Sequence, residues 1–457
     1  MKFNKDKKFK IAQFTDLHWD QNNSESCETV VQNIQRVLDA ERPDLVFLTG
    51  DIVTYNPAKE GWHSIAAIFE KAAQPWSVVL GNHDDETSLS RHDIFELLKP
   101  LPYFIGETGT VSGAGNFVIQ LQSAEGDELA ALLYGIDSHG YPADKRHGDY
   151  DWVKFDQIEW YRKTSAAFTQ SNQGVPLPAL AFFHIPLLEY NDIVGMPTTV
   201  GVKGEAVASS KINSGLFSAF VEMGDVMGTF VGHDHVNNYI GITHNIALAY
   251  GQKTGEKSYG DLKKGGRIIE LTQGKRSFNT WISTEDGSTY PYNYPFGMSF
   301  LDDEGPYQSA VEPAVVKQGL QFTYYEGNFN SVQDMAMALP VKTGVVENLT
   351  LTNAEVKDHF GFVFKGFIKI PAKGYYRFYT FSDDGSSLWI GNQEVVNNDG
   401  GHSPTRKEGI IALEAGFHPI RVLYFESYMG ELLEVGMSSL QQSEALLSNE
   451  MLFYSNQ

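Results

Sequence analysis

Five short apolar runs of the sequence each end in side chains that can bind a metal ion. A lone aspartate or histidine after a strand more often forms a turn or caps a helix. Five endings of this kind, three of them preceded by glycine, are hard to explain by capping alone. We therefore expect these side chains to meet in one site. The endings are Asp16-Leu17-His18, Gly50-Asp51, Gly81-Asn82-His83-Asp84, His184 and Gly232-His233-Asp234-His235.

The residue types at these endings narrow the metal and the reaction. Carboxylate, imidazole and amide groups without thiolate suit zinc, manganese, iron or magnesium, and disfavour copper(I) or an iron–sulfur cluster. Seven ligands exceed what one ion can use while leaving room for substrate, whereas two ions that share a carboxylate use them well. Paired ions about 3.5–4 Å apart polarise a phosphoryl oxygen and lower the pKa of a bridging water. The pattern therefore predicts hydrolysis of a phosphate ester with two metal ions.

The candidate ligands need strands to position them. Runs rich in Val, Ile, Leu and Phe, each about five residues long, are typical of buried strands. Between the first two runs, residues 28–41 place apolar side chains on one helical face, with Pro43 just beyond. Strands that alternate with helices predict an α/β layered fold, in which ligands bind at the carboxyl ends of the strands. The runs are residues 9–14, 45–49, 77–80, 132–136, 180–184, 227–231 and 246–250.

The character of the sequence changes near residue 301. A hairpin is predicted at residues 267–272 and 277–283, and the following segment is poor in large apolar residues and contains Asp-Asp-Glu-Gly-Pro. This composition indicates an interdomain linker. Beyond it, short alternating strands separated by Gly, Asn and Asp turns predict an all-β sandwich. We therefore expect domains at residues 1–300 and 318–457, joined by a linker at 301–317.

Length and charge set broader limits. A chain of 457 residues is expected to form two or three domains. The formal net charge of −22 argues against binding nucleic acid or an anionic membrane through general electrostatics. No apolar run is long enough for a membrane span, and the basic first ten residues lack the apolar core of a secretory signal. The single cysteine, Cys27, excludes an internal disulfide framework.

In order and spacing, the five endings resemble the signature of the calcineurin-like metallophosphoesterases. The resemblance extends from about residue 8 to residue 283, and residues 157–160 and 213–216 bring it closest to the branch related to purple acid phosphatases. It implies a two-sheet β-sandwich flanked by helices. It also implies that Asp16, His18 and His235 hold one ion, that Asn82, His184 and His233 hold the other, and that Asp51 bridges them.

The same resemblance gives His83 a different role. It implies that His83 faces the phosphate and protonates the leaving oxygen, with Asp84 orienting the imidazole. Purple acid phosphatases carry a tyrosine ligand three positions after the bridging aspartate. Here that position is Thr54, followed by Tyr55, which argues against a tyrosinate–iron centre.

The C-terminal part resembles a PA14 domain. The matching segments are residues 319–326, 374–378, 382–386, 388–390 and 416–422. Some PA14 domains bind glycans through a calcium ion held by adjacent aspartates, at the position of Asp383 and Asp384, although Ser-Asp-Asp-Gly also forms a plain hairpin turn. The resemblance implies a glycan as partner and a periplasmic, cell-surface or secreted location.

Three functions follow from these patterns. The favoured one is a phosphomonoesterase with an accessory glycan-binding module. The alternatives are a phosphodiesterase acting on cyclic nucleotides or glycerophosphodiesters, and a glycan-binding surface protein with a non-catalytic phosphoesterase scaffold. The complete ligand set argues against the scaffold. The choice of substrate is expected to depend on pocket walls in residues 140–151 and 190–210. His139 either lines the substrate side of the site or packs against the fold.

Overall fold

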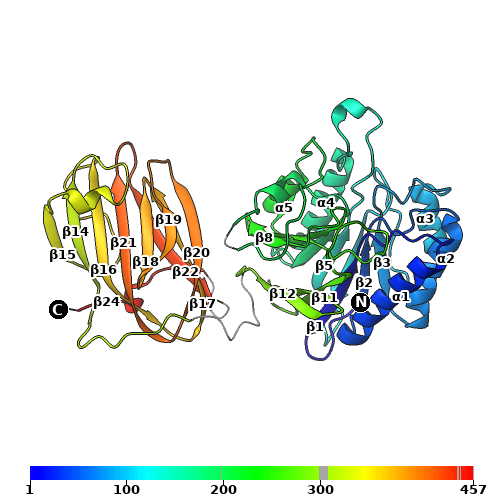
Figure 1. The fold of residues 1–457 in the computed structure, drawn as a ribbon, viewed down its shortest axis with the longest axis horizontal. Coiled ribbons are helices and arrows are strands. Elements are labelled where there is room, and N and C mark those ends of the chain that lie inside the picture. Colours follow the sequence, from blue (N-terminus) through cyan, green and yellow to red (C-terminus); the bar gives the residue numbers. More distant parts are fainter. Residues whose placement is uncertain (197, 298–306, 440–441, 443, 456–457) are drawn as a thin grey trace. The chain divides into compact units, whose positions relative to one another are not determined.

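The computed structural model describes residues 1–196, 198–297, 307–439, 442 and 444–455. The chain forms two compact units, Met1–Leu301 and Asp302–Gln457 (Figure 1). Residues 301–306 of the expected linker lie outside the described residues. Further along it, Gln308 donates its amide hydrogen to Ala412 O and Val311 donates to Phe417 O, so these residues lie against strands of the second unit.

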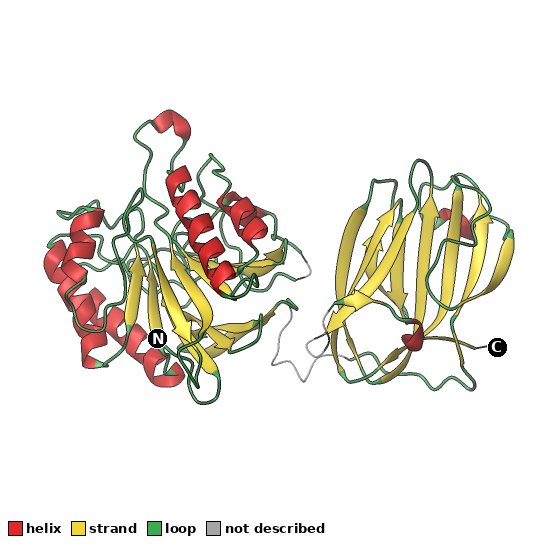
Figure 2. Cartoon of the chain, turned by 180° about the vertical axis from the view of Figure 1, so that it is seen from behind, coloured by secondary structure: helices red, strands yellow, loops and turns green. Residues whose placement is uncertain are grey.

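The first unit is a sandwich of two six-stranded sheets with helices outside them, which confirms the predicted fold class (Figure 2). The strand orders are β12-β11-β10-β1-β2-β3 and β4-β5-β6-β7-β9-β8. The first sheet comprises β1 (Lys8–Phe14), β2 (Leu45–Thr49), β3 (Trp76–Val79), β10 (Gly265–Thr272), β11 (Phe278–Thr284) and β12 (Gly287–Tyr294). The second comprises β4 (Phe117–Gln122), β5 (Leu129–Gly135), β6 (Ala179–Phe182), β7 (Val226–Val231), β8 (Ile240–Thr243) and β9 (Ile246–Tyr250).

The helices of this unit begin and end where local chemistry dictates. In α1 (Ser24–Glu41) the Asn23 side chain accepts a hydrogen bond from Ser26 N, and the helix ends at Arg42 in a left-handed conformation. The Asn23 cap explains why this helix begins before the apolar pattern that predicted it. The other helices are α2 (Ala58–Lys71), α3 (Arg91–Leu98), α4 (Phe155–Ser171) and α5 (Leu216–Met223), with short 3-10 turns at η1 (Lys145–His147) and η2 (Leu188–Asn191).

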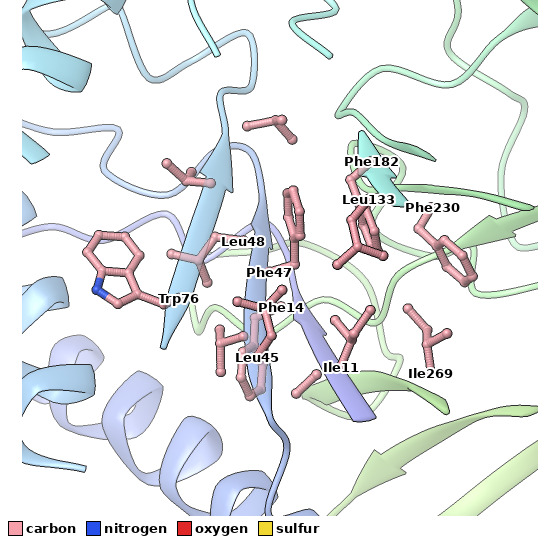
Figure 3. Packing of buried hydrophobic residues seen from close by; sticks show 14 of the residues in the cluster. Ile11, Phe14, Leu45, Phe47, Leu48, Trp76, Leu133, Phe182, Phe230 and Ile269 are labelled. Carbon is pink, nitrogen blue, oxygen red and sulfur yellow. The ribbon is translucent and has the colours of Figure 1, made fainter. Parts of the chain in front are cut away.

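Aromatic packing fixes the two sheets of the first unit against each other. Phe47 of β2 stacks on Phe182 of β6, with ring centroids 4.1 Å apart and an interplanar angle of 10°. Phe230 of β7 lies against Phe182 at 5.3 Å, and Figure 3 shows these rings among Ile11 and Leu133. Full burial of one such side chain stabilises the fold by about 1.5–3 kcal/mol. The contact joins β2 of the first sheet to β6 of the second, an inner strand in each case.

The direction of the strands determines where the candidate ligands lie. β1, β2 and β3 are mutually parallel, as are β5, β6, β7 and β9. Because parallel strands end at the same edge of a sheet, the segments that follow them emerge together.

The second unit is an all-β sandwich, as predicted, with a core of its own. Its larger sheet contains β13 (Lys317–Gln318), β14 (Leu320–Glu326), β15 (Lys342–Val346), β16 (Phe360–Ile370), β18 (Ser386–Ile390), β19 (Gln393–Asn398), β21 (Gly416–Glu426) and β24 (Leu452–Tyr454). Its smaller sheet contains β17 (Gly374–Asp383), β20 (Thr405–Leu413), β22 (Leu432–Ser439) and β23 (Ala445–Leu446). Short helical turns are η3 (Asp334–Met337) and η4 (Asn449–Met451).

Two separate hydrophobic cores predict two independent folding units. Each unit has buried hydrophobic clusters built from its own residues. A chain that stops after residue 301 should therefore unfold cooperatively, at the same temperature as one of two calorimetric transitions of the full-length protein. A fragment without a cooperative transition would contradict this independence.

Candidate metal centre

The structure brings the candidate ligands together at the strand ends of the first unit. They form two neighbouring groups, and within each group the potential ligand atoms lie within 4.8 Å of one another. The first group is Asp16, His18 and His235; the second is Asp51, His184 and His233. Asn82 lies next to the second group, because the following residue, His83, donates its amide hydrogen to Asp51 Oδ1 at 2.9 Å.

Left-handed backbone turns aim four of these side chains. Asp16, His18, Asp51 and His233 have φ angles of 55°, 45°, 53° and 77°. Such conformations cost about 1–3 kcal/mol at a non-glycine residue and persist where surrounding contacts enforce them. Here Asp16 N donates to Gly50 O at 3.1 Å and His18 N donates to Asp51 O at 2.9 Å. The ends of β1 and β2 therefore hold each other in this conformation.

Glycine is required before three of the endings, because neighbouring residues lie too close there to leave room for a side chain. A Cβ atom at Gly50 would clash with the His184 ring, and one at Gly81 would clash with the Asp51 carboxylate. A Cβ atom at Gly232 would clash with Thr15. The repeated glycines in the sequence therefore mark the places where one strand end must approach another.

In the first group, nitrogen and oxygen lone pairs face one another. His235 Nε2 lies 3.3 Å from Asp16 Oδ1 and 3.2 Å from His18 Nε2. Two imidazole nitrogens at this distance repel unless a proton or a cation lies between them. Thr54 Oγ1 lies 3.4 Å from His18 Nδ1, whereas the exposed Tyr55 ring lies under Lys257. Tyr55 therefore does not take the place of a tyrosine ligand.

In the second group, a backbone contact fixes the orientation of His184. Its Nδ1 donates to Thr49 O at 2.7 Å, so that Nε2 faces Asp51 Oδ2 at 3.2 Å. Burial lowers the pKa of His184, but the Asp51 carboxylate outweighs burial and raises it to about 9. Burial, reinforced by His184, lowers the pKa of His233 to about 3. His233 is therefore a neutral imidazole at physiological pH, the form that binds metals.

In the second group and the adjoining Asn82, three buried atoms have no hydrogen-bond partner among the described residues. They are Asn82 Oδ1, His184 Nε2 and His233 Nε2. Leaving a buried polar atom unsatisfied costs about 1–3 kcal/mol. Asn82 Oδ1 and His233 Nε2 offer lone pairs, and His184 Nε2 offers one once a cation displaces its proton, so a bound cation satisfies all three atoms. The donor set therefore fits a metal ion.

The structure corrects the expected role of Asp84. Its fully buried carboxylate does not contact His83 but accepts hydrogen bonds from four backbone amides, those of Asp51, Ile52, Val53 and Gly81, at 2.7–3.0 Å. His83 Nδ1 instead lies 2.6 Å from Glu86 Oε2. Although Asp84 follows His83 directly in the sequence, its side chain points away from the His83 ring and into the loop after β2. Glu86, and not Asp84, is therefore the carboxylate in contact with His83, and this contact was not predicted from the sequence.

The surroundings of His83 favour its charged form. Partial burial lowers its pKa, but the nearby Asp51 carboxylate and the contact with Glu86 outweigh this and raise it. The imidazolium form can donate a proton. The ring is partly exposed, and its centroid lies 5.9 Å from that of His18.

A buried ion pair braces the loop that carries Asn82 and His83. Arg91, the first residue of α3, contacts Asp137 through Nη2 at 2.6 Å and Nε at 3.0 Å, and its Nη1 donates to Gly81 O at 2.8 Å. This ion pair was not predicted from the sequence. The only signal available was the position of Asp137 just after a predicted strand.

Both segments that were predicted to form the pocket walls have residues near the metal site: tyrosines from residues 140–151 and Glu205 from residues 190–210. Tyr141 and Tyr150 come from residues 140–151, and the Tyr150 ring meets the His233 ring edge-on at 4.5 Å. The Tyr259 ring lies 4.2 Å from that of His235, and its hydroxyl donates to Glu205 at 2.8 Å.

His139 contacts Gln157 at 2.7 Å, which favours the packing role. Residue 197 of the second predicted wall lies outside the described residues.

A third group of possible metal ligands, all of them acidic, lies in the second unit. Asp383, Asp384 and Glu426 bring their carboxylates together. Asp384 accepts hydrogen bonds from the backbone amides of His402 and Ser427 at 2.8 and 2.9 Å. Glu426, which the sequence analysis missed, is fully buried and its Oε1 has no partner among the described residues. Burial and the charge of Asp384 raise the pKa of Glu426 to about 7.

Comparison with known proteins agrees with this architecture. The family model described as calcineurin-like phosphoesterase matches residues 9–237, and the model of the PA14 domain matches residues 316–449. Among the described residues, no helix has the length and apolar character needed to cross a membrane.

Curated relatives carry mixed names. "Probable inactive purple acid phosphatase 29" of Arabidopsis thaliana is 28% identical over 69% of this chain and 90% of its own length. "Probable inactive purple acid phosphatase 28" of the same plant is 30% identical over 62% of this chain and 79% of its own length. "Phosphatase DCR2" of Saccharomyces cerevisiae is 31% identical over 65% of this chain and 57% of its own length. With the family match and the clustered Asp and His residues, these similarities show that the chain belongs to the calcineurin-like phosphoesterase family and carries a C-terminal PA14 domain.

Proposed function

We propose that the first unit hydrolyses phosphomonoesters with two bound metal ions. The observation that carries the proposal is the pair of adjacent ligand groups with three buried, unpartnered donor atoms between the strand ends. In this proposal Asp16, His18 and His235 form the first metal site. Asn82, His184 and His233 form the second metal site, and the Asp51 carboxylate is shared by both. The donor set suits iron, zinc, manganese or magnesium, including a mixed-valence pair.

The side chains divide the work of the reaction. Bound at these sites, the ions would polarise the phosphoryl oxygens and lower the pKa of the attacking water. His83 supplies the proton to the leaving oxygen. Because Glu86 accepts from Nδ1, the proton for transfer is the one on Nε2. Glu86 thereby also fixes the direction of the imidazole.

The names of the plant relatives raise the alternative of a non-catalytic scaffold. The geometry of this chain supports activity instead, because each proposed ligand lies at the strand-end edge and His83 retains an orienting carboxylate. The Arg91–Asp137 clamp beside Asn82 also supports a site whose geometry is maintained.

A substrate screen tests this function together with the role of Asp51. Protein reconstituted with Mn²⁺ or Zn²⁺ should bind two ions per chain and hydrolyse p-nitrophenyl phosphate faster than bis-p-nitrophenyl phosphate. Asp51→Asn preserves the shape of the side chain but weakens the shared ligand, so occupancy of both sites and turnover should fall together. Asp39→Asn, on the exposed face of α1, is the control and should bind both ions. An Asp51→Asn protein with two ions and normal turnover would disprove the bridging role.

Acid catalysis by His83 predicts a dependence on the leaving group. His83→Asn should keep both ions yet lose about 10²–10⁴-fold in rate on alkyl phosphates. The loss should be smaller on p-nitrophenyl phosphate, because p-nitrophenolate leaves without needing a proton. The exposed His63, changed to Asn, serves as control. Equal losses on both substrates would assign His83 to phosphate binding instead.

For the second unit we propose a calcium ion held by Asp383, Asp384 and Glu426 and presented to a glycan, consistent with a periplasmic, cell-surface or secreted location. Three clustered carboxylates, those of the buried Asp384 and Glu426 and the half-buried Asp383, supply the oxygen ligands that calcium prefers. Calcium should raise the melting temperature of the wild-type protein, and Asp383→Asn should abolish this shift. A wild-type melting temperature that stays constant up to millimolar calcium would leave the acids without a metal role.

A further inference from the structure

Tyr141 lies where the second metal site meets the proposed acid, His83. Its hydroxyl oxygen accepts a hydrogen bond from Asn82 Nδ2 at 3.0 Å and lies 3.4 Å from His83 Nδ1. The carboxylate of Glu86, which contacts His83 Nδ1, lies near enough to raise the pKa of Tyr141 together with burial. The Tyr141 hydroxyl therefore lies within hydrogen-bonding distance of both Asn82, a proposed metal ligand, and His83, the proposed proton donor.

The contact matters because the Asn82 amide has two different ends. Its oxygen offers lone pairs to a metal, whereas its NH2 group offers only hydrogens. The observed amide turns Nδ2 to Tyr141 and leaves Oδ1 buried without a partner, like His184 Nε2 and His233 Nε2. Rotation by half a turn would present the NH2 group to the metal site and remove a ligand.

The partners of the hydroxyl decide which amide orientation is stable. Burial and the nearby negative charge of Glu86 raise the pKa of Tyr141, and that charge attracts the hydrogen of the Tyr141 hydroxyl, because a carboxylate only accepts hydrogen bonds. The hydroxyl then offers Asn82 an acceptor oxygen, which pairs with NH2 and not with Oδ1. The hydrogen bond between Asn82 and Tyr141, with the charge of Glu86 beside the hydroxyl, therefore favours the amide orientation that suits a metal.

The ring of Tyr141 is itself held in place. Lys145 Nζ lies 4.9 Å from its centroid, and the Tyr150 ring lies 6.2 Å away at an interplanar angle of 26°. The ends of this loop are joined by a hydrogen bond from Asp151 N to Gly140 O at 3.0 Å. Gly140 lies close to Asn82, because a Cβ atom there would sit 3.4 Å from the Asn82 backbone.

We propose that Tyr141 is a positioning residue, whose hydroxyl holds the Asn82 amide with Oδ1 directed at the second metal site. The inference rests on the proposed function, since it concerns the second of the two ions. Removal of a side chain that orients a metal ligand typically weakens metal affinity about 10–100-fold. The effect should fall on one ion, because Asn82 belongs to one site.

The test is a calorimetric titration of the metal-free full-length protein with Mn²⁺. Tyr141→Phe keeps the ring and its contacts with Lys145 and Tyr150 but removes the hydroxyl. One ion should bind as in the wild type and the other about 10–100-fold more weakly, while the melting temperature of the metal-free protein stays unchanged. Tyr290→Phe is the control: it removes a hydroxyl from an exposed tyrosine of β12, and should bind both ions as in the wild type.

A second variant separates orientation from general loosening of the site. In Asn82→Asp both oxygens can bind a metal, so the orientation of the group no longer matters. Adding Tyr141→Phe to Asn82→Asp should therefore cause no further loss of affinity. An undiminished loss in this background, or normal binding of both ions by Tyr141→Phe alone, would overturn the inference. Failure of the wild-type chain to bind two ions would instead overturn the proposed function and the inference with it.

Discussion

The burial of the Asp16 and Asp51 carboxylates beside imidazole nitrogens is the constraint on which the first unit depends. Each residue is 1% exposed, and their closest imidazole nitrogens belong to His235 and His184, at 3.3 and 3.2 Å. Placing an ionised carboxylate away from water costs several kcal/mol unless positive charge or hydrogen bonds compensate. The pKa of each aspartate is nevertheless lowered, because the neighbouring histidines outweigh the effect of burial. The site is therefore built to receive positive charge.

Much of the surrounding structure keeps these groups from moving apart. Asp84 gathers the backbone amides of the loops after β2 and β3, and the Arg91–Asp137 pair holds the carbonyl of Gly81. The stacked Phe47 and Phe182 rings set the distance between the two sheets, and through it the distance between Asp51 and His184. Left-handed turns and close-packed glycines are tolerated because these contacts enforce them.

In the second unit, as in the first, one buried carboxylate binds backbone amides while another keeps an unpaired oxygen. Asp384 is fixed by two backbone amides, whereas Glu426 is buried with one oxygen unpaired. In both units, hydrogen-bonded carboxylates hold the loops, and carboxylates or imidazoles with free lone pairs remain for a cation. With a net charge of −22, the protein favours an anionic substrate only where such local positive charge is added.

The sequence by itself determined the strands that carry ligands and the residues that end them. A buried strand such as β2 is recorded locally as an apolar run, and Gly50-Asp51 follows it directly, so both are visible without a partner strand. β4 was missed because its pattern is half-exposed and no ligand-type residue ends it. Family resemblance added the division of roles between the ligands.

Only the tertiary structure decided which way the other polar side chains turn. Asp84 holds backbone and not His83, Glu86 takes the orienting role, and Glu426 joins Asp383 from 43 residues further along the chain. Tyr141 meets Asn82 across 59 positions of sequence. Such contacts depend on which loops the packed sheets bring together. Local sequence specifies the strand and its last residue, but the direction of a side chain is set by partners that are distant in sequence and near in space.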